Sequence, residues 1–205
     1  MVPGTFARNE LATDLKGTQI GVDLGLRHRA VVSEPKSGKR QFFSGKLIGF
    51  IRRRFRSLRK SLGKKKALRA LKSADKKESR IITDYNKKLA KKIVDFALKF
   101  NSPVIKMENL ANIRQSCRSL KYADRTIHSW AFYQLQKYIK QKALKSGIPV
   151  VLVKPEYTSQ RCFLCGHIHK NNRYKDKFVC KKCGRSSHAD LNASYNIAVN
   201  TNLAA

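Results

Sequence analysis

Acidic residues are scarce in this chain of 205 residues. It carries 13 Asp and Glu against 45 Lys and Arg, which gives a formal net charge of +32. A surplus of this size destabilises a compact chain by self-repulsion unless a polyanion neutralises it, so nucleic acid is the expected partner. A solvated basic surface and an anionic membrane are the alternative readings of the same charge.

Long apolar runs are also absent. A membrane-spanning helix needs about 18 or more apolar residues, and the sequence contains no such run, which predicts no membrane span. The opening MVPGTFARNE lacks the apolar centre of a secretory signal, so we expect a cytoplasmic protein of the prokaryotic cytosol or nucleoid. In that reducing compartment, cysteines favour metal binding over disulfides.

Strands dominate the first part of the chain. Between residues 18 and 45, the segments TQIGVDLG, HRAVVSEP and KRQFFSG are separated by Gly and Pro turn signals, which predicts three consecutive antiparallel strands. Residues 46–72 then hold 12 basic residues and no acidic one, with apolar residues at helical spacing. We expect an amphipathic basic helix there and a second helix over about residues 78–100.

Helices and strands alternate after Pro103. VIKMENL predicts a short strand, residues 126–146 a helix, IPVVLVKP a strand buried on both faces, and DLNASYNIAVN a last helix. This alternation favours parallel strand pairing. The predicted fold class is therefore α/β, with a mixed sheet and flanking helices.

Four cysteines form two C-x-x-C pairs, Cys162 with Cys165 and Cys180 with Cys183, and a glycine follows each pair. Each pair turns two thiolates toward one point, so the two pairs together can close a tetrahedral zinc site. Four thiolates leave no open coordination position, which predicts a structural Zn²⁺ ion and places catalysis elsewhere. Disulfides are the alternative, and Cys117 is expected to be an ordinary free thiol.

Three of the few carboxylates stand on elements expected to be part of the core. Asp23 ends the first strand, Glu108 ends the VIKME strand, and Asp190 opens the last helix. A buried carboxylate is costly unless it is paired or binds metal, so either lysine salt bridges or a shared divalent ion is expected. Two Mg²⁺ or Mn²⁺ ions held by such acids can activate water against a phosphodiester.

The sequence resembles the TnpB, or OrfB, family of transposon-encoded proteins. The resemblance rests on GVDLG, MENL and the string from YTSQRCFLCGH through C-x-x-CG to HADLNAS, and it covers about residues 18–200. Known members of that family are RNA-guided DNA nucleases related to type V CRISPR effectors. Their fold is RNase H-like, of the RuvC type, with an inserted zinc ribbon.

The resemblance implies a role for seven residues. Three acids correspond to the catalytic triad and four cysteines to the zinc ligands: Asp23, Glu108, Asp190, Cys162, Cys165, Cys180 and Cys183. It implies DNA and a guide RNA as partners. Four arginines of the first basic helix are expected to grip phosphates: Arg52, Arg53, Arg56 and Arg59.

The resemblance also suggests a domain division. Residues 18–156 and 186–200 would form the nuclease core, with a basic helical hairpin at 46–100, and residues 157–185 the zinc ribbon. Residues 1–17 would be a short N-terminal remnant and 201–205 a tail, because full-length family members carry a long N-terminal part before the first strand. A separately encoded N-terminal half is accordingly a possible partner.

The leading hypothesis is a metal-dependent DNA endonuclease core of transposon origin. The competing hypothesis is a non-catalytic nucleic-acid-binding protein that regulates or assists a transposon. A third reading, a DNA-strand transferase, follows from the use of the word transposase for this family.

Overall fold

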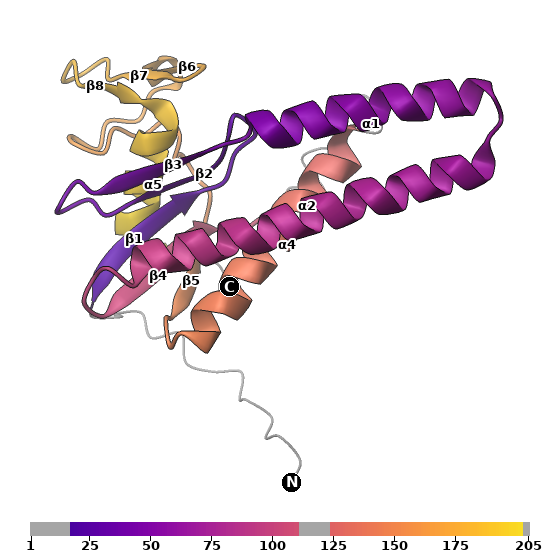
Figure 1. The fold of residues 1–205 in the computed structure, drawn as a ribbon. Helices are drawn as coiled ribbons and strands as arrows, with labels where there is room; N and C mark the ends of the chain where they lie inside the picture. The colour runs from indigo at the N-terminus through magenta and orange to yellow at the C-terminus, as the bar shows by residue number, and fades with distance from the viewer. Residues whose placement is uncertain (1–16, 111–123, 203–205) are drawn as a thin grey trace, which may run out of the picture.

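The computed structural model describes residues 17–110 and 124–202. Its centre is a five-stranded sheet in the order β3-β2-β1-β4-β5 (Figure 1). The strands are β1 (Thr18–Asp23), β2 (His28–Ser33), β3 (Arg40–Ser44), β4 (Pro103–Glu108) and β5 (Val150–Val153). Cys117 and most of the predicted N-terminal segment and tail lie outside the described residues.

Strand pairing agrees with the sequence. β1 pairs antiparallel with β2, and β2 with β3, so the three consecutive strands form the expected meander. β1 and β4 are parallel, and so are β4 and β5, which a helix connects across the sheet. The mixed α/β sheet with flanking helices is confirmed.

Helices cover both faces of the sheet. Ile20 and Val22 of β1 pack against α2 (Leu68–Ala97) and α4 (Asp124–Lys145), whereas Val31 of β2 packs against α5 (Ala189–Val199). The alternation of side chains along a strand sends neighbouring residues to opposite faces. The core therefore has two layers, which Figure 1 shows on either side of the sheet.

The boundary between the two basic helices differs from the prediction. α1 (Lys46–Lys64) ends eight residues before the expected end, and α2 begins at Leu68 instead of about residue 78. Lys66 adopts a φ of 54°, a left-handed conformation that reverses the chain. α1 then packs antiparallel on α2, with Ile48 against Ile82, and the pair projects from the sheet as a long hairpin (Figure 1).

One acid of α2 is buried. Glu78 is only 5% exposed and accepts an ion-pair contact from Arg59 across the hairpin, while Asp75 pairs with the same guanidinium at 3.2 Å. Helical periodicity did not reveal this burial because the predicted helix began at Glu78, so its first turns had no expected partner. The hairpin brings α1 over that position.

A smaller sheet precedes α5. Its antiparallel strands are β6 (Arg173–Tyr174), β7 (Lys177–Val179) and β8 (Ser186–His188), in the order β6-β7-β8, preceded by the 3-10 turn η2 (Lys170–Asn172). Phe178 packs in its interior with Cys162, Cys180 and Ala189. None of the helices within residues 17–110 and 124–202 is both long and apolar enough to cross a bilayer.

Gly21 fixes how closely α5 approaches β1. A Cβ atom at Gly21 would lie 1.8 Å from the carbonyl oxygen of Ser194 and 2.8 Å from the amide nitrogen of Ala198. A hydrogen bond of 2.7 Å between the hydroxyls of Ser33 and Ser194 joins the same surfaces. The GVD motif therefore needs glycine because the α5 backbone contacts the strand directly.

Gly21→Ala is expected to lower the free energy of unfolding by about 3 kcal/mol, because the overpacked methyl group forces α5 away from the sheet. Urea denaturation measures the effect. Gly63→Ala in α1 is the matched control, since no atom lies within 4 Å of the added Cβ, and it should be neutral or stabilising by up to about 1 kcal/mol. Equal midpoints for the two variants would contradict the packing described.

Candidate functional site

Two carboxylates lie side by side at the carboxyl edge of the central sheet. β1 and β4 are parallel neighbours in which Val22 is opposite Met107, so Asp23 and Glu108 end the two strands at the same level. Adjacent strands are about 4.8 Å apart. The sheet thus places both acids at one edge.

Asp190 reaches the same edge from the first turn of α5. One carboxylate oxygen, Oδ1, accepts a hydrogen bond of 2.9 Å from Arg173, and the other, Oδ2, lies 3.0 Å from Nδ1 of His28. The His188 side chain caps α5 by accepting the amide N–H of Asp190 at 3.2 Å. Asp190 is buried at 8% exposure and is held from three directions.

The three carboxylates affect one another electrostatically. Burial and the charges of Glu108 and Asp190 raise the pKa of Asp23 to about 8, although the Arg173 guanidinium acts in the opposite direction. Burial also raises the pKa of Glu108, against the lowering effects of a hydrogen bond from the Thr158 hydroxyl and of Arg173. The site has more negative charge than Arg173 can neutralise, and a cation would satisfy it.

Asp23→Asn is expected to stabilise the metal-free protein at pH 8. The folded-state pKa of Asp23, about 8, exceeds its ordinary value of 3.8, so the ionised carboxylate is unfavourable at pH 8 and the penalty disappears as the pH falls toward 4. Each pKa unit is worth about 1.4 kcal/mol, and a gain of at least that size is expected. Thermal unfolding with Mg²⁺ omitted, from pH 8 to 5, should show the wild type approaching the variant as the pH falls.

The matched control is Asp84→Asn, because Asp84 is exposed on α2 and pairs with the exposed Lys88 at i,i+4. It should change stability by less than about 0.5 kcal/mol at either pH. A loss of stability in Asp23→Asn at pH 8 would mean that Asp23 is satisfied by protein groups alone.

Three residues of this site were not predicted from the sequence. Arg173 comes from β6, Thr158 from the loop after β5, and His28 from the start of β2. Arg173 is one of many basic residues between Lys170 and Arg185, and nothing in its local sequence distinguishes it. The guanidinium of Arg173 reaches Asp190 because residues 157–185, which we call the cysteine segment, fold over α5.

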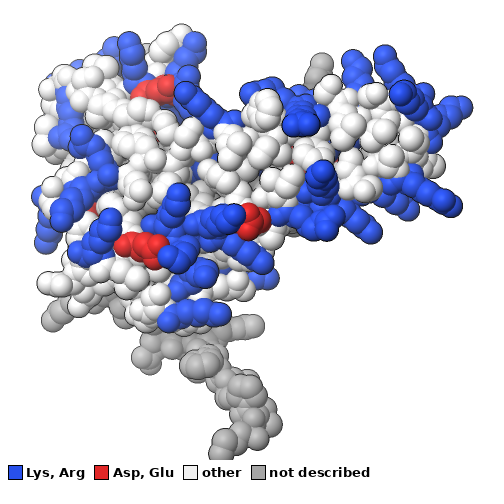
Figure 2. Space-filling view, in the orientation of Figure 1, with Lys and Arg blue, Asp and Glu red and all other residues white. Residues whose placement is uncertain are grey.

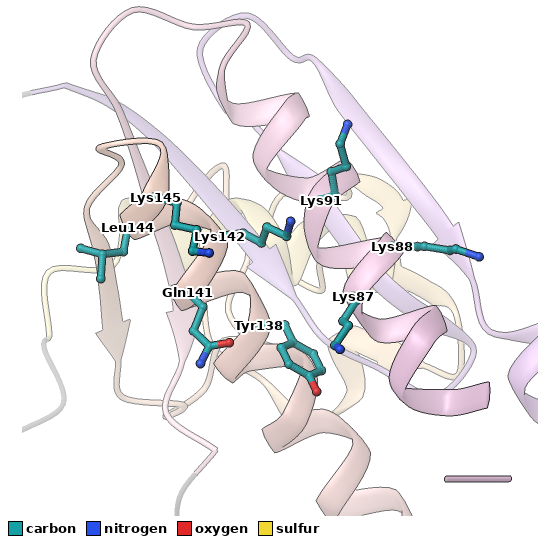
Figure 3. A pocket seen from close by; sticks show the side chains of 8 residues that line it. All are labelled: Lys87, Lys88, Lys91, Tyr138, Gln141, Lys142, Leu144 and Lys145. Carbon is teal, nitrogen blue, oxygen red and sulfur yellow. The ribbon is translucent and has the colours of Figure 1, made fainter. Parts of the chain in front are cut away.

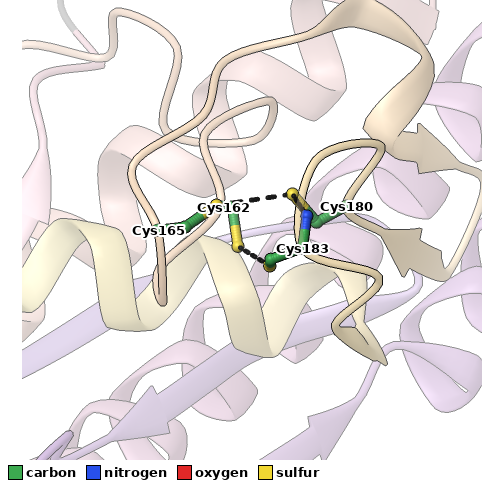
Figure 4. Close-up of side chains that lie close together, drawn as sticks. All are labelled: Cys162, Cys165, Cys180 and Cys183. Carbon is green, nitrogen blue, oxygen red and sulfur yellow. Dashed lines mark hydrogen bonds between the residues drawn. The ribbon is translucent and has the colours of Figure 1, made fainter.

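The four cysteines of the two C-x-x-C pairs converge, as Figure 4 shows. The sulfur atoms of Cys162 and Cys183 are 3.7 Å apart, those of Cys165 and Cys180 are 3.6 Å apart, and all four lie within 4.8 Å of one another. Zinc–sulfur bonds of about 2.3 Å in a tetrahedron separate the sulfurs by about 3.8 Å. The observed spacing fits a four-thiolate zinc site and is far too long for a disulfide.

Backbone geometry supports a thiolate site. Gly166 and Gly184, one residue after each pair, adopt φ values of 70° and 71°, as the sequence predicts for this kind of turn. The amide N–H of Cys183 donates to the sulfur of Cys180 at 3.5 Å and that of Lys182 at 3.4 Å. These donors lower the pKa of the Cys180 thiol to about 6, which favours the metal-binding thiolate.

Two asparagines of α5 attach the cysteine segment to the core. The Asn192 amide donates to the carbonyl oxygen of Arg161 at 2.7 Å and accepts the backbone N–H of Phe163 at 3.1 Å. Asn196 donates to the carbonyl oxygens of Thr158 and Arg161. The HADLNAS motif therefore supplies Asp190 to the site and, through Asn192, part of the contacts that hold the cysteine segment, and Asn196 two residues later supplies the rest.

The four predicted phosphate-binding arginines do not share one surface. Arg53 and Arg56 are exposed on α1, whereas Arg52 is buried at 9% exposure and Arg59 is engaged with Glu78 and Asp75. Helical spacing explains this division, because Arg52 and Arg59 lie on the face that packs against α2. Of these four arginines, Arg53 and Arg56 are the two that are exposed and could contact phosphate.

A second basic surface lies between α2 and α4. The helices line a groove of about 590 Å³, and Figure 3 shows its lysines and Tyr138 among the lining side chains: Lys87, Lys88, Lys91, Lys142 and Lys145. Lys88 and Lys91 each pair with an acid on the outer side of α2, while Lys87 lies 5.7 Å from the centre of the Tyr138 ring. Figure 2 shows basic side chains along this part of the molecule and over the hairpin.

Comparison with known proteins extends these observations. Residues 132–197 match the family model described as Cas12f1-like, TNB domain. The chain is 33% identical to the CRISPR-associated endodeoxyribonuclease Cas12f1 of Syntrophomonas palmitatica, over 91% of this chain and 39% of that protein. It is 30% identical to a TnpB-like protein of Aquifex aeolicus, over 76% of this chain and 55% of that protein.

The fold has a counterpart among solved structures. The cryo-EM structure of a Cas12f1-sgRNA-target DNA complex superposes with a TM-score of 0.73 at 23% identity, covering 91% of this chain and 50% of that one. The likeness in fold thus extends over most of this chain. The chain spans about two fifths to one half of the length of the Cas12f1 proteins it matches.

Proposed function

This chain is a relative of the TnpB-like and Cas12f proteins, and from that relationship we propose that it is the nuclease core of an RNA-guided DNA endonuclease. The observation that carries the proposal is the convergence of Asp23, Glu108 and Asp190 at one edge of the sheet. Relatives that are named endodeoxyribonucleases support phosphodiester cleavage as the reaction.

The five-stranded mixed sheet would be an RNase H-like core of the RuvC type. We assign residues 18–156 and 186–200 to this core, the hairpin at 46–100 to a basic extension of it, and residues 157–185 to an inserted zinc ribbon. The meander β1-β2-β3 followed by parallel β4 and β5 supports the first assignment. Four converging thiolates support the last, and Zn²⁺ would be structural there.

Each residue of the acid site has a proposed task. Asp23, Glu108 and Asp190 would hold Mg²⁺ or Mn²⁺, since carboxylate oxygens suit these ions. The bound ions would activate water and stabilise the leaving oxygen of the phosphodiester. Arg173 and His28 would orient the Asp190 carboxylate, and the Thr158 hydroxyl that of Glu108.

DNA and a guide RNA are the proposed partners. A net charge of +32 and the exposed Arg53, Arg56 and lysine groove provide phosphate contacts on the α1–α2 hairpin and on the α2–α4 surface. These surfaces bind backbone and would not read sequence.

Nucleic-acid binding is expected to weaken steeply with salt and to depend on the lysine groove. The double variant Lys87→Ala with Lys142→Ala should have a shallower slope of log affinity against log salt. Its magnitude should decrease by about 0.7 to 0.9 for each phosphate contact removed. Fluorescence anisotropy with a labelled oligonucleotide measures the slope. Lys36→Ala, in the exposed turn between β2 and β3, is the control and should leave it unchanged. A slope equal in all three proteins would exclude the groove from the interface.

The alternative function is nucleic-acid binding without cleavage, which the charge and the basic surfaces alone would support. End-labelled DNA incubated with the protein and Mg²⁺ or Mn²⁺ separates the two. Metal-dependent products support the nuclease, and tight binding without products supports the binder.

A further inference from the structure

Two imidazole rings lie next to the Asp190 carboxylate, beside the acid site formed by Asp23, Glu108 and Asp190. His28 begins β2, His188 ends β8 and Asp190 opens α5, and one ligand atom of each lies within 4.8 Å of the others. His28 Nδ1 and Asp190 Oδ2 are 3.0 Å apart. Ligand atoms about 2.1 Å from one metal ion lie about 3.0 to 3.4 Å apart, so this pair already has a suitable spacing.

The ring of His188 has a nitrogen within 4.8 Å of the ligand atoms of His28 and Asp190. Its Nδ1 accepts the amide N–H of Asp190, which requires that this nitrogen carry no proton. A metal bond to Nδ1 would replace the hydrogen bond of 3.2 Å that caps α5. The ring can therefore serve as a ligand through Nδ1 in exchange for this cap.

Aromatic contacts hold both rings in place. The ring centres of His28 and His188 are 4.9 Å apart at 72°, and Phe42 packs edge to face with each at 5.2 Å. Ligands that packing has already oriented bind metal with a smaller loss of conformational entropy. Phe42 thus contributes to a preformed arrangement.

The three side chains are accessible from solvent, and the neighbouring guanidinium groups are already paired with carboxylates. The His28 side chain is 21% exposed and that of Asp190 11%, so the groups can be reached from solvent. Arg173 occupies Asp190 Oδ1 and leaves Oδ2 for the imidazoles, while Arg27 is paired with Asp176.

We propose that His28, His188 and Asp190 bind a late first-row transition ion such as Zn²⁺ or Ni²⁺, at a site separate from the four thiolates. Imidazole nitrogen favours these ions, whereas Mg²⁺ takes oxygen ligands. The ion replaces the proton between His28 Nδ1 and Asp190 Oδ2, and that proton passes to solvent. Because it withdraws Asp190 from the acid site, the ion inhibits cleavage; this consequence rests on the proposed function, but binding does not.

Metal counting tests the proposal without any need for cleavage. The untagged full chain, with zinc in its four-thiolate site, is dialysed against Ni²⁺ in excess Mg²⁺, and nickel and zinc are counted by elemental analysis. The wild type should hold one nickel ion more per chain than His28→Gln or His188→Gln. The affinity of either variant for nickel should be at least about tenfold lower, and the zinc content of all three proteins should be the same. His167→Gln, in the cysteine segment, should keep the nickel.

Equal nickel contents in the wild type and both variants would overturn the site, as would nickel that enters only by displacing zinc. Glutamine at either position could disturb the hydrogen bonds around Asp190, so a second measurement uses the unaltered protein. Co²⁺ should produce paramagnetically shifted ring-proton signals from two histidines, and their absence would also overturn the proposal. A chain that binds Ni²⁺ as described but cuts no DNA would refute the nuclease and support the site.

Discussion

Asp190→Ala is expected to reduce metal-dependent DNA cleavage on the order of a thousandfold or more while leaving DNA affinity within about twofold or slightly higher. The carboxylate is one of three that would hold the ions, and its loss removes charge stabilisation that the remaining two cannot supply. Removing a negative group near phosphate favours binding if it has any effect. Single-turnover cleavage and anisotropy on the same labelled DNA measure both quantities.

Two companion variants separate chemistry from folding. Alanine at position 190 leaves Arg173 and His28 without their partner, whereas Asp190→Asn keeps the size and an acceptor for Arg173. Both variants should be equally inactive, although Asp190→Asn should unfold close to the wild-type temperature. Asp95→Ala, on the exposed face of α2, should cut normally. Substantial cleavage by Asp190→Asn would remove Asp190 from the proposed metal ligands.

Cys180→Ser is expected to abolish stoichiometric zinc binding and unfold the ribbon. Structural zinc sites supply about 10 kcal/mol or more of apparent binding free energy, and a serine hydroxyl does not replace a thiolate. Cys180 is 2% exposed and packs with Cys162, Phe178 and Ala189, so its loss also disturbs the small core beneath the sheet β6-β7-β8. Zinc content by elemental analysis should fall well below one per chain.

The same substitution should also impair cleavage, since Arg173 reaches Asp190 from β6 of that segment. Cys117→Ser is the matched control, because the fifth cysteine belongs to neither C-x-x-C pair. It should keep its zinc and its activity. A Cys180→Ser protein with unchanged zinc and thermal unfolding would show that the four thiolates do not form a metal site.

The sheet was predictable because its signals are local. Gly and Pro separate the first three strands, and valine-rich runs mark β5, whose side chains are covered by α5 on one face and by the main core on the other. The end of α1 was not predictable in the same way. Residues 64–66 are three lysines, which are good helix formers, and the reversal at Lys66 is stabilised by packing of α1 on α2.

The acids and the cysteines could be found from the sequence because scarcity and spacing set them apart. Arg173, Thr158 and His28 could not, since each acts through a contact between segments distant in the chain: 17 residues separate Arg173 from Asp190, 50 separate Thr158 from Glu108, and 162 separate His28 from Asp190. Composition also does not distinguish the buried Arg52 of α1 from its exposed neighbours. Tertiary packing decides these points, and a basic chain offers many equivalent candidates.

The most direct test of the nuclease assignment is cleavage of end-labelled single-stranded and double-stranded DNA by the purified chain. Reactions contain Mg²⁺, Mn²⁺ or EDTA, with and without co-purified RNA, and are run beside Asp23→Ala. The account predicts products that require the divalent ion and disappear in the variant. Tight binding without cutting under every condition, or cutting that survives the loss of Asp23, would contradict it.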